Sequence, residues 1–245
     1  MTPDVQTLYD VVEATWPPAS TRRAGPWTVR DGAGGGKRVS AATADGPVTG
    51  SDIAAMEAAQ AKLGQDPLVM LRAGEDDLDA MLAAAGYEII DPVVLYAAPI
   101  DAVTGPHPPV TAFPHWPPLA MTLDLWVEGG IGPERVAVME RAKGPKTAIL
   151  ARTEDTPAGA AFVAIHQDIA MIHALEVAPK LRRKGAARNM MRCAANWAQD
   201  MGARYFSLVV TEANSAARPL YASLNLKVVG NYHYRIKKPV KGPNR

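Results

Sequence analysis

Two periods of hydrophobic positions run along the chain, and they indicate where helices and strands lie. Apolar residues at spacings of three and four predict helices, whereas alternating or short unbroken apolar runs predict strands. In the first part of the chain these patterns predict helices near 3–14, 51–63 and 75–85 and strands near 67–71 and 89–97. A hairpin is also expected from residues 26–31 and 37–44, which flank the glycine-rich turn GAGGG.

The second part of the chain continues with the same two patterns. They predict a helix near 132–143, strands at 147–152, 159–165 and 169–177, a helix at 185–201, a strand at 205–210, a helix near 215–224 and a strand at 228–237. Pro133 fits the first turn of its helix, where a missing N–H costs nothing. Three consecutive antiparallel strands followed by alternating helices and strands indicate a mixed α/β fold, of the α+β kind with a mixed sheet.

Prolines mark the expected boundary between two domains. Seven of them fall in residues 99–118, a density that neither a helix nor a central strand tolerates. We therefore expect four parts: an N-terminal domain at 1–104, a semi-rigid proline-rich connector at 105–118, a second domain at 119–238 and a flexible tail at 239–245.

The two domains share a weak internal similarity. Residues 82–99 can be aligned with residues 222–239, so that Gly86 corresponds to Asn225. Each segment is predicted to be a helix that ends at a residue tolerant of the left-handed conformation and is followed by a strand. The alignment indicates two copies of one structural unit.

The charge balance, the single cysteine and the absence of targeting features indicate what the protein binds and where it is found. The 245 residues include 26 Lys and Arg against 25 Asp and Glu, so no global basic field draws the chain to nucleic acid or anionic lipid. The single cysteine, Cys193, cannot form an internal disulfide, and the N-terminal segment lacks the features of a signal peptide. No window is long and apolar enough for a transmembrane helix. We expect a cytoplasmic protein that binds neither nucleic acid nor membrane.

A cluster of positive charge stands at the start of the helix expected at 185–201. Three basic residues, 182–184, come directly before Gly185, and Arg188 follows one turn later. The first N–H groups of a helix have no internal partners and lie at the positive end of its dipole, so they can bind an anion. The charges alone fit a solvated basic loop equally well.

The context of this cluster resembles a known motif. The run R-R-K-G-A-A is similar to the Q/R-x-x-G-x-G/A acetyl-CoA motif of the Gcn5-related N-acetyltransferases (GNAT). Arg182, Gly185 and Ala187 occupy the defining places. In that family the amides of the loop hold the pyrophosphate of CoA, and the resemblance implies the same role here.

A second segment resembles the same family. In its later motif an asparagine begins a helix that presents a tyrosine, and Asn214 and Tyr221 match these positions. Asn225 stands where the family favours glycine, but asparagine also tolerates a positive φ. The resemblance covers residues 119–238 and implies the acyl-CoA N-acyltransferase (GNAT) fold, in tandem with a degenerate GNAT-like N-terminal half. Because that half lacks the loop motif, one CoA site is expected rather than two.

The resemblance also assigns roles to individual residues. The residues that it implies for acetyl-CoA binding are Val177, Arg182, Arg183, Lys184, Gly185, Ala186, Ala187 and Asn214. The main-chain N–H of Val177 would polarise the thioester carbonyl, and Tyr221 would protonate the departing thiolate.

The base that deprotonates the acceptor is open at this point. Glu176 and His173 lie on the strand nearest the acetyl group and, three residues apart, are expected on opposite faces. Glu176 is preferred as the catalytic base, because a carboxylate in an apolar strand needs a task or a partner. A salt bridge between Glu176 and a nearby arginine is the competing interpretation. Glu212 and a water chain are further candidates.

The predicted function is an N-acetyltransferase that moves the acetyl group of acetyl-CoA to an amine by direct attack in a ternary complex. A non-catalytic acyl-CoA-binding or sensing module is the alternative. The acceptor is expected to be a small-molecule or peptide amine, and a homodimer stays open. No metal is expected, because the five histidines show neither i, i+4 pairs nor cysteine partners. Trp116 and Trp126 are expected in the core rather than in a substrate groove.

Overall fold

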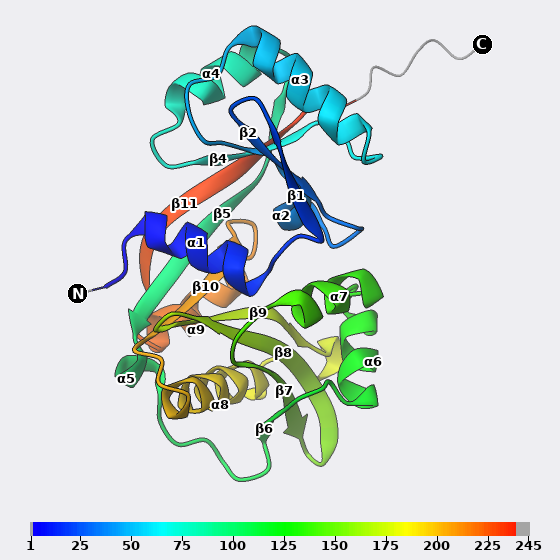
Figure 1. Cartoon of the computed structure of the whole chain (residues 1–245). Helices are drawn as coiled ribbons and strands as arrows, with labels where there is room; N and C mark the ends of the chain where they lie inside the picture. The colour runs from blue at the N-terminus through cyan, green and yellow to red at the C-terminus, as the bar shows by residue number, and fades with distance from the viewer. Residues whose placement is uncertain (1, 239–245) are drawn as a thin grey trace. The chain divides into compact units, whose positions relative to one another are not determined.

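The computed structural model describes residues 2–238 and divides the chain into two compact units (Figure 1). Unit 1 combines the segment that ends at Pro17 with Val94–Val210 and Asn214–Gly230. Unit 2 combines Pro18–Val93 and Thr211–Ala213 with the segment that begins at Asn231. The predicted tail at 239–245 lies outside the described residues.

Unit 1 is built on a mixed sheet. Its own strands are β6 (Ala112–His115), β7 (Lys146–Thr153), β8 (Thr156–His166), β9 (Ile169–Val177) and β10 (Tyr205–Thr211). Strands β6 to β9 are antiparallel neighbours, and β9 pairs with β10 in parallel. Beyond β10 come β5 (Glu88–Pro99) and β11 (Lys227–Ile236), each of which has residues in both units. The predicted mixed α/β sheet is confirmed.

The helices of unit 1 cover both faces of this sheet. They are α1 (Val5–Thr15), α5 (Ile100–Val103), α6 (Ala120–Glu128), α7 (Pro133–Arg141), α8 (Ala186–Asp200) and α9 (Arg218–Ser223), with 3₁₀ turns at Pro179–Leu181 and Ser215–Ala217. Helix α8 crosses β6–β9 on one face, and α1 and α6 pack against β8 and β9 (Figure 1). Ile172 belongs to the core around α8, whereas the next residue, His173, contacts α1. Helices α8 and α1 therefore lie on opposite faces.

Helix α8 is fixed by the apolar stripe expected from the sequence. Met190, Met191, Ala194 and Ala198 are buried completely. Each buried methionine contributes about 2 kcal/mol of transfer free energy. Met201, at the C-cap, is 51% exposed because the helix ends at the preceding residue. The direction in which α8 presents its N-terminus is thus set by packing.

Unit 2 has its own small sheet and core. Its elements are β1 (Ser20–Ala24), β2 (Trp27–Asp31), α2 (Lys37–Ser40), β3 (Thr43–Ala44), α3 (Gly50–Ala61), β4 (Leu68–Arg72) and α4 (Asp76–Ala84). Strands β1, β2 and β3 form one sheet, and β4 pairs antiparallel with β11. Trp27, Met56 and Leu82 are fully buried between these elements.

The predicted hairpin of residues 26–31 and 37–44 is wrong in its main partner. Strand β2 pairs along its whole length with β1, around Gly25 at φ 61°. Residues 37–40 form helix α2, and of the expected second strand only Thr43 and Ala44 pair with β2. Strand β1 has the sequence STRRA and is largely exposed, so no hydrophobic alternation marks it.

The proline-rich connector at 105–118 contains an edge strand that the sequence analysis did not predict. Residues 112–115 form β6, which includes Pro114. Proline is tolerated there because β6 is the edge strand of its sheet, where one N–H faces no partner. Helix α6 was also missed. Since the segment before Pro17 belongs to unit 1, the compact units do not coincide with the predicted domains 1–104 and 119–238.

The internal similarity is visible in the ends of two helices. Gly86, at φ 84°, follows α4, and Asn225, at φ 60°, follows α9. At both positions the N–H of this residue donates to the carbonyl three residues back at 3.0 Å, and the next N–H donates to the carbonyl five residues back at 3.0 or 3.1 Å. Both helices therefore end in the same hydrogen-bond pattern. Among residues 2–238, no helix has the length and apolar character needed to cross a membrane.

Candidate active site

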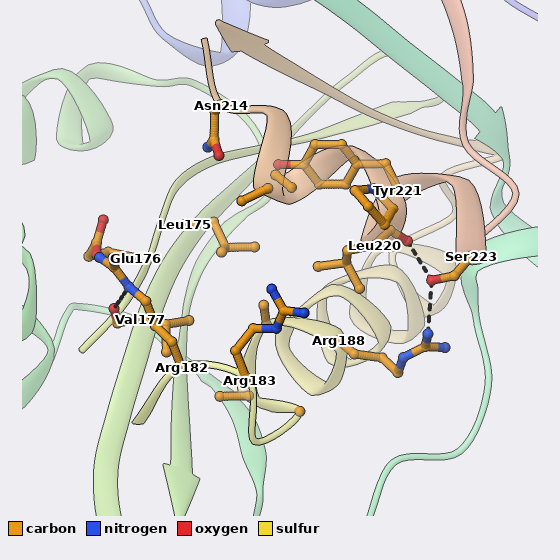
Figure 2. Close-up of a pocket in the computed structure, with 16 residues that line it drawn as sticks. Leu175, Glu176, Val177, Arg182, Arg183, Arg188, Asn214, Leu220, Tyr221 and Ser223 are labelled. Carbon is orange, nitrogen blue, oxygen red and sulfur yellow. Dashed lines mark hydrogen bonds and ion pairs between the residues drawn. The ribbon is translucent and has the colours of Figure 1, made fainter. Parts of the chain in front are cut away.

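A cavity of about 650 Å³ lies in unit 1 between the end of β9, the start of α8 and the segment that leads into α9 (Figure 2). It is lined by Leu175, Glu176, Val177, Arg182, Arg183, Gly185, Ala186, Ala187, Arg188, Asn214, Ala216, Ala217, Pro219, Leu220, Tyr221 and Ser223. Of the ten residues that the sequence analysis assigned to the site, the structure brings all but Lys184 to this cavity.

The start of α8 is open toward the cavity. Gly185 occupies the N-cap position at φ 91°, and no side chain caps the helix. A Cβ at Gly185 would meet nothing within 4 Å. No side chain therefore occupies the first N–H groups of α8, at Ala186 and beyond, where the helix borders the cavity. Free N–H groups at a helix N-terminus bind phosphate oxygens.

The basic residues before Gly185 differ in their partners. Arg182 donates to Glu176 Oε1 at 2.9 Å and to the carbonyl of Val177 at 3.0 Å. Lys184 instead forms an ion pair with Glu154 at 3.2 Å, and it is not among the residues that line the cavity. Glu154 lies in the turn between β7 and β8, a contact that the local sequence does not reveal.

Arg183 is the cation that points into the cavity. Its backbone has φ 65°, and Figure 2 shows its side chain between the β9 side of the cavity and α8. Within the described residues 2–238 its guanidinium has neither a hydrogen bond nor an ion pair. Arg188 lines the outer end and donates to Ser223 Oγ at 2.8 Å, a neutral partner that leaves its charge uncompensated. Two positive charges are therefore available to an anionic ligand.

Strand β9 contains a bulge beside the cavity. On β8, Ala160 pairs with Glu176. Phe162, two residues after Ala160, pairs with His173, which is three residues before Glu176. Strand β9 therefore has one more residue than β8 in this interval, which is a β-bulge. Ala174, within the bulge, has φ 50°. The bulge overturns the expectation that Glu176 and His173 face opposite sides: paired with β8 residues two apart, both lie on the face that α1 and α6 cover.

His173 does not reach the cavity. It is 5% exposed, and its Nε2 lies 2.8 Å from Thr15 Oγ1 on α1. Its ring also packs on Trp16, with the ring centroids 5.1 Å apart. His173 is thus a buried histidine of the core, and its candidacy as a base in the cleft is removed.

The main-chain amide of Val177 points away from β8. The N–H of Ala178 donates to the carbonyl of Ala158 at 2.9 Å, so the Gly159–Val177 pair is of the kind without mutual hydrogen bonds. On its other side, β9 pairs with β10 only through residues 169–172. The N–H of Val177 therefore opens toward the side on which β9 and β10 have separated.

Tyr221 lines the opposite side of the cavity on α9. In Figure 2 its ring extends toward the side where Leu175 and Asn214 lie. The side chain is 8% exposed, and its ring centroid is 5.4 Å from that of Tyr96. Burial, with a smaller contribution from Tyr96, raises the pKa of Tyr221 to about 12. The hydroxyl is therefore protonated at neutral pH, as a proton donor must be.

Sequence analysis missed most of the apolar lining. Leu175, Ala216, Ala217, Pro219 and Leu220 form an apolar wall on either side of Tyr221. Their positions next to the predicted motifs on β9 and α9 are the only sequence signal for them. Glu212, an alternative base, is not among the lining residues. Within residues 2–238, no group of three or more His, Cys, Asp or Glu side chains is placed to hold a metal ion.

A mixed sheet in which two parallel strands, β9 and β10, separate beside the open N-terminus of α8 fits the acyl-CoA N-acyltransferase fold expected from the sequence. Residues 113–225 match the sequence profile of the acetyltransferase (GNAT) family. These residues therefore form a domain that matches the GNAT family, whose members in general transfer acyl groups and use acetyl-CoA.

Comparisons over the whole chain agree with this assignment. The uncharacterized N-acetyltransferase YobR of Bacillus subtilis (strain 168) is 25% identical over 96% of this chain and 99% of its own length. The fold is similar to that of a GCN5-related N-acetyltransferase from Kribbella flavida, with a TM-score of 0.64, 16% identity, and coverage of 94% of this chain and 95% of that one. A tandem GNAT protein from the clavulanic acid biosynthesis pathway has a TM-score of 0.60 at 13% identity and covers 97% of this chain and 89% of its own.

Proposed function

We propose that the protein is an acetyl-CoA-dependent N-acetyltransferase that acts on an amine in a ternary complex. The observation that carries the proposal is the uncapped start of α8, at Gly185, on the wall of a 650 Å³ cavity. In this proposal the main-chain N–H groups beyond Arg182 hold the diphosphate of CoA, and Arg183 supplies countercharge. The acceptor is a small-molecule or peptide amine, and the compartment is the cytoplasm.

The proposed reaction is a direct attack of the neutral amine on the thioester carbonyl. The Val177 N–H stabilises the oxyanion of the tetrahedral intermediate. When the C–S bond breaks, the Tyr221 hydroxyl gives its proton to the CoA sulfur. The nitrogen of the acceptor loses a proton to Glu176, directly or through a water molecule, so that charge and protons balance.

The only cysteine of the chain supports direct attack over an acyl-enzyme intermediate. Cys193 is buried in α8, and burial raises the pKa of its thiol to about 12. A thiol with this pKa has almost no thiolate at neutral pH, so it is a poor nucleophile. The acetyl group is therefore transferred directly from CoA to the amine, without a cysteine-bound acyl-enzyme.

The Glu176–Arg182 ion pair favours a second candidate function. A carboxylate engaged by a guanidinium at 2.9 Å is a less available base, which is compatible with a non-catalytic acyl-CoA-binding or sensing module. The side chain of Glu176 is 24% exposed, so an acceptor or a water can still reach it. The two functions share the CoA pocket and differ only in turnover.

Two measurements on the full chain test the proposal. Thermal unfolding is recorded with CoA and with acetyl-CoA, and release of the CoA thiol is recorded on a panel of amines. The enzyme predicts stabilisation by both nucleotides and thiol release that depends on at least one amine. Stabilisation without turnover on a broad panel indicates the binding module. If neither nucleotide raises the melting temperature at millimolar concentration, both functions are refuted.

A further inference from the structure

The bulge in β9 determines which side chains and which main-chain N–H groups of this strand face the cavity. The contacts that stabilise the bulge therefore affect the geometry of the site. All three residues after Ala174 line the cavity, but because of the bulge Leu175 and Val177 pack with the core around α8, while the side chain of Glu176 lies beside the end of α6. A regular strand would shift every later side chain to the other face. Ala174, with φ 50°, adopts a conformation that residues with a Cβ rarely take. Something outside β9 must therefore hold it.

Helix α6 supplies this contact through a tryptophan. Trp126 is fully buried, and its indole Nε1–H donates to the carbonyl oxygen of Ala174 at 2.9 Å. At the end of the same helix, a Cβ on Gly129 would lie 2.4 Å from Glu176 Cγ, which shows how closely the helix approaches the strand. Helix α6 thus contacts β9 at the bulge itself and again two residues later.

We propose that Trp126 is a positioning residue for acyl transfer: its indole N–H holds the Ala174 carbonyl in the bulge and thereby keeps the Val177 amide directed at the thioester carbonyl. This inference rests on the proposed function. Trp126 touches neither the cavity nor the reacting atoms, and it acts through the backbone from Ala174 to Val177. The hydrogen bond fixes the orientation of a donor whose geometry determines the rate.

The test uses a variant that removes the N–H and keeps an aromatic ring. Trp126→Phe is compared with Trp27→Phe, since Trp27 is also fully buried and donates its indole N–H to a backbone carbonyl, that of Asp52, at 3.0 Å. Trp27 lies in unit 2 and is not among the residues that line the cavity. Both variants lose one buried hydrogen bond of the same kind, so both are expected to unfold at a lower temperature.

The decisive readout is the carbonyl resonance of bound [1-¹³C]acetyl-CoA, which moves downfield when a donor polarises the thioester. In Trp126→Phe the downfield shift is expected to shrink and kcat to fall about tenfold or more. The Kd for CoA, set by the start of α8, stays within about twofold. Trp27→Phe keeps the shift and the kcat of the wild-type protein.

A second substitution tests the bulge directly. Ala174→Gly relieves the cost of the positive φ, so in the Trp126→Phe background it is expected to recover part of the shift and of kcat. If Trp126→Phe does not fold, replacement of Trp126 by benzothienylalanine, which keeps the ring size and lacks the N–H, gives the same comparison.

The outcomes separate this inference from the proposed function. A Trp126→Phe protein that keeps both the carbonyl shift and kcat overturns the positioning role, whatever happens to its stability. A wild-type protein that binds acetyl-CoA with a shifted carbonyl but turns over no amine refutes the enzyme, while the shift in Trp126→Phe still tests the positioning role. A wild-type protein that shows no carbonyl shift, or does not bind acetyl-CoA, overturns the inference.

Discussion

Tyr221 combines two properties that a proton donor to a thiolate needs. Its side chain lines the cavity, and burial together with Tyr96 raises its pKa to about 12. Within residues 2–238 its hydroxyl makes no hydrogen bond, so the proton is not committed to another group of the described chain. When a CoA thiolate formed nearby takes this proton, Tyr221 becomes a tyrosinate, and the proton that the acceptor nitrogen gives up restores it through Glu176 or solvent.

We expect Tyr221→Phe to lower kcat about a hundredfold and to leave the Kd for CoA within twofold, because the ring that lines the pocket remains. Tyr205→Phe is the control, since Tyr205 lies on β10 and outside the cavity lining. Steady-state kinetics and calorimetric titration measure the two quantities. Unchanged kcat in Tyr221→Phe would remove the acid role and spare the fold.

The dependence of kcat on pH tests whether the Tyr221 hydroxyl stays protonated. With a pKa of about 12, Tyr221 stays protonated across the range in which the protein can be assayed. Its deprotonation therefore contributes no fall in kcat as pH rises to 10. A fall centred near 10 that Tyr221→Phe abolishes would show that the hydroxyl titrates as an ordinary tyrosine and would contradict the effect of burial.

Single residues were predictable where a motif constrained them. Gly185, Arg182, Asn214 and Tyr221 reach the cavity as their motif positions implied. The ion pair of Lys184 was not predictable, because its partner, Glu154, is 30 residues away in sequence and only the folded chain brings them together. Local patterns specify which residues form an element, but not which distant charge a flexible side chain meets.

At the scale of elements, helix α8 contributes most through its first turn. Gly185 holds φ 91°, and the space where its Cβ would lie is open to the cavity. Gly202, beyond the other end of α8, has φ 90° and equally open surroundings. The two glycines therefore carry the same backbone requirement, and only one of them lies at the proposed phosphate site.

We expect Gly185→Ala and Gly202→Ala each to lower the free energy of unfolding by about 1 kcal/mol, the cost of a left-handed alanine. Only Gly185→Ala is expected to raise the Kd for CoA, by about tenfold or more, because its methyl group occupies space that phosphate oxygens need. Chemical denaturation and calorimetric titration measure both effects. Equal CoA affinity in the two variants would contradict the role of this turn.

A carboxylate on α4 ties that helix to β11 in unit 2. Asp79 accepts hydrogen bonds from Arg235 at 2.6 and 2.9 Å and lies 2.8 Å from His233 Nε2. The bond from Arg235, followed by that from His233, lowers the pKa of Asp79 from 3.8 to about 2 against the opposing effect of burial. The charged form is therefore the one that stabilises the fold.

Because the folded pKa is below the unfolded value, the contribution of Asp79 is present above pH 4 and is lost as pH falls toward 2. Asp79→Asn is expected to cost about 2 kcal/mol at pH 7, and the difference from the wild-type protein is expected to shrink between pH 4 and pH 2. Asp77→Asn, on the same helix and without an ion pair in the described chain, is the control. A difference that does not change with pH in urea denaturation would contradict the ion pair.

Elements with a strong period could be predicted, and elements without one could not. Helix α8 and strands β7, β8, β9 and β10 appeared at their expected places because burial fixes their pattern. Strand β1 is polar, and β6 lies within prolines, so neither carries an apolar signal. The bulge at Ala174 has no signature in the sequence IAMIHALEV, since it depends on Trp126 from another element.

At the scale of the whole molecule, the two units differ in the starts of their longest helices, α3 in unit 2 and α8 in unit 1. In unit 2 the turn before α3 is closed by a capping box, in which Asp52 accepts hydrogen bonds from the N–H of Thr49 at 2.8 Å and from its hydroxyl at 2.6 Å. In unit 1 the start of α8 has no such cap. The carboxylate of Asp52 at the start of α3 opposes an anion there, so a diphosphate is expected at the start of α8.

The cavity of unit 2 is also unsuited to an anion. It has a volume of about 760 Å³ and is lined by Asp45, Glu75 and Asp77. Arg72 is the one basic residue of this lining, and it is paired with Glu75 at 2.6 Å. The excess of negative charge repels phosphate groups. One CoA molecule per chain is expected, as the loss of the loop motif from the N-terminal half already indicated.

The most direct measurement is an experimental structure of the chain with bound acetyl-CoA. The account predicts one nucleotide, with its diphosphate oxygens within hydrogen-bond distance of the main-chain N–H groups at 183–187 and its thioester carbonyl beside the N–H of Val177. A diphosphate bound at the start of α3, or a nucleotide bound elsewhere while the Gly185 turn stays empty, would contradict it.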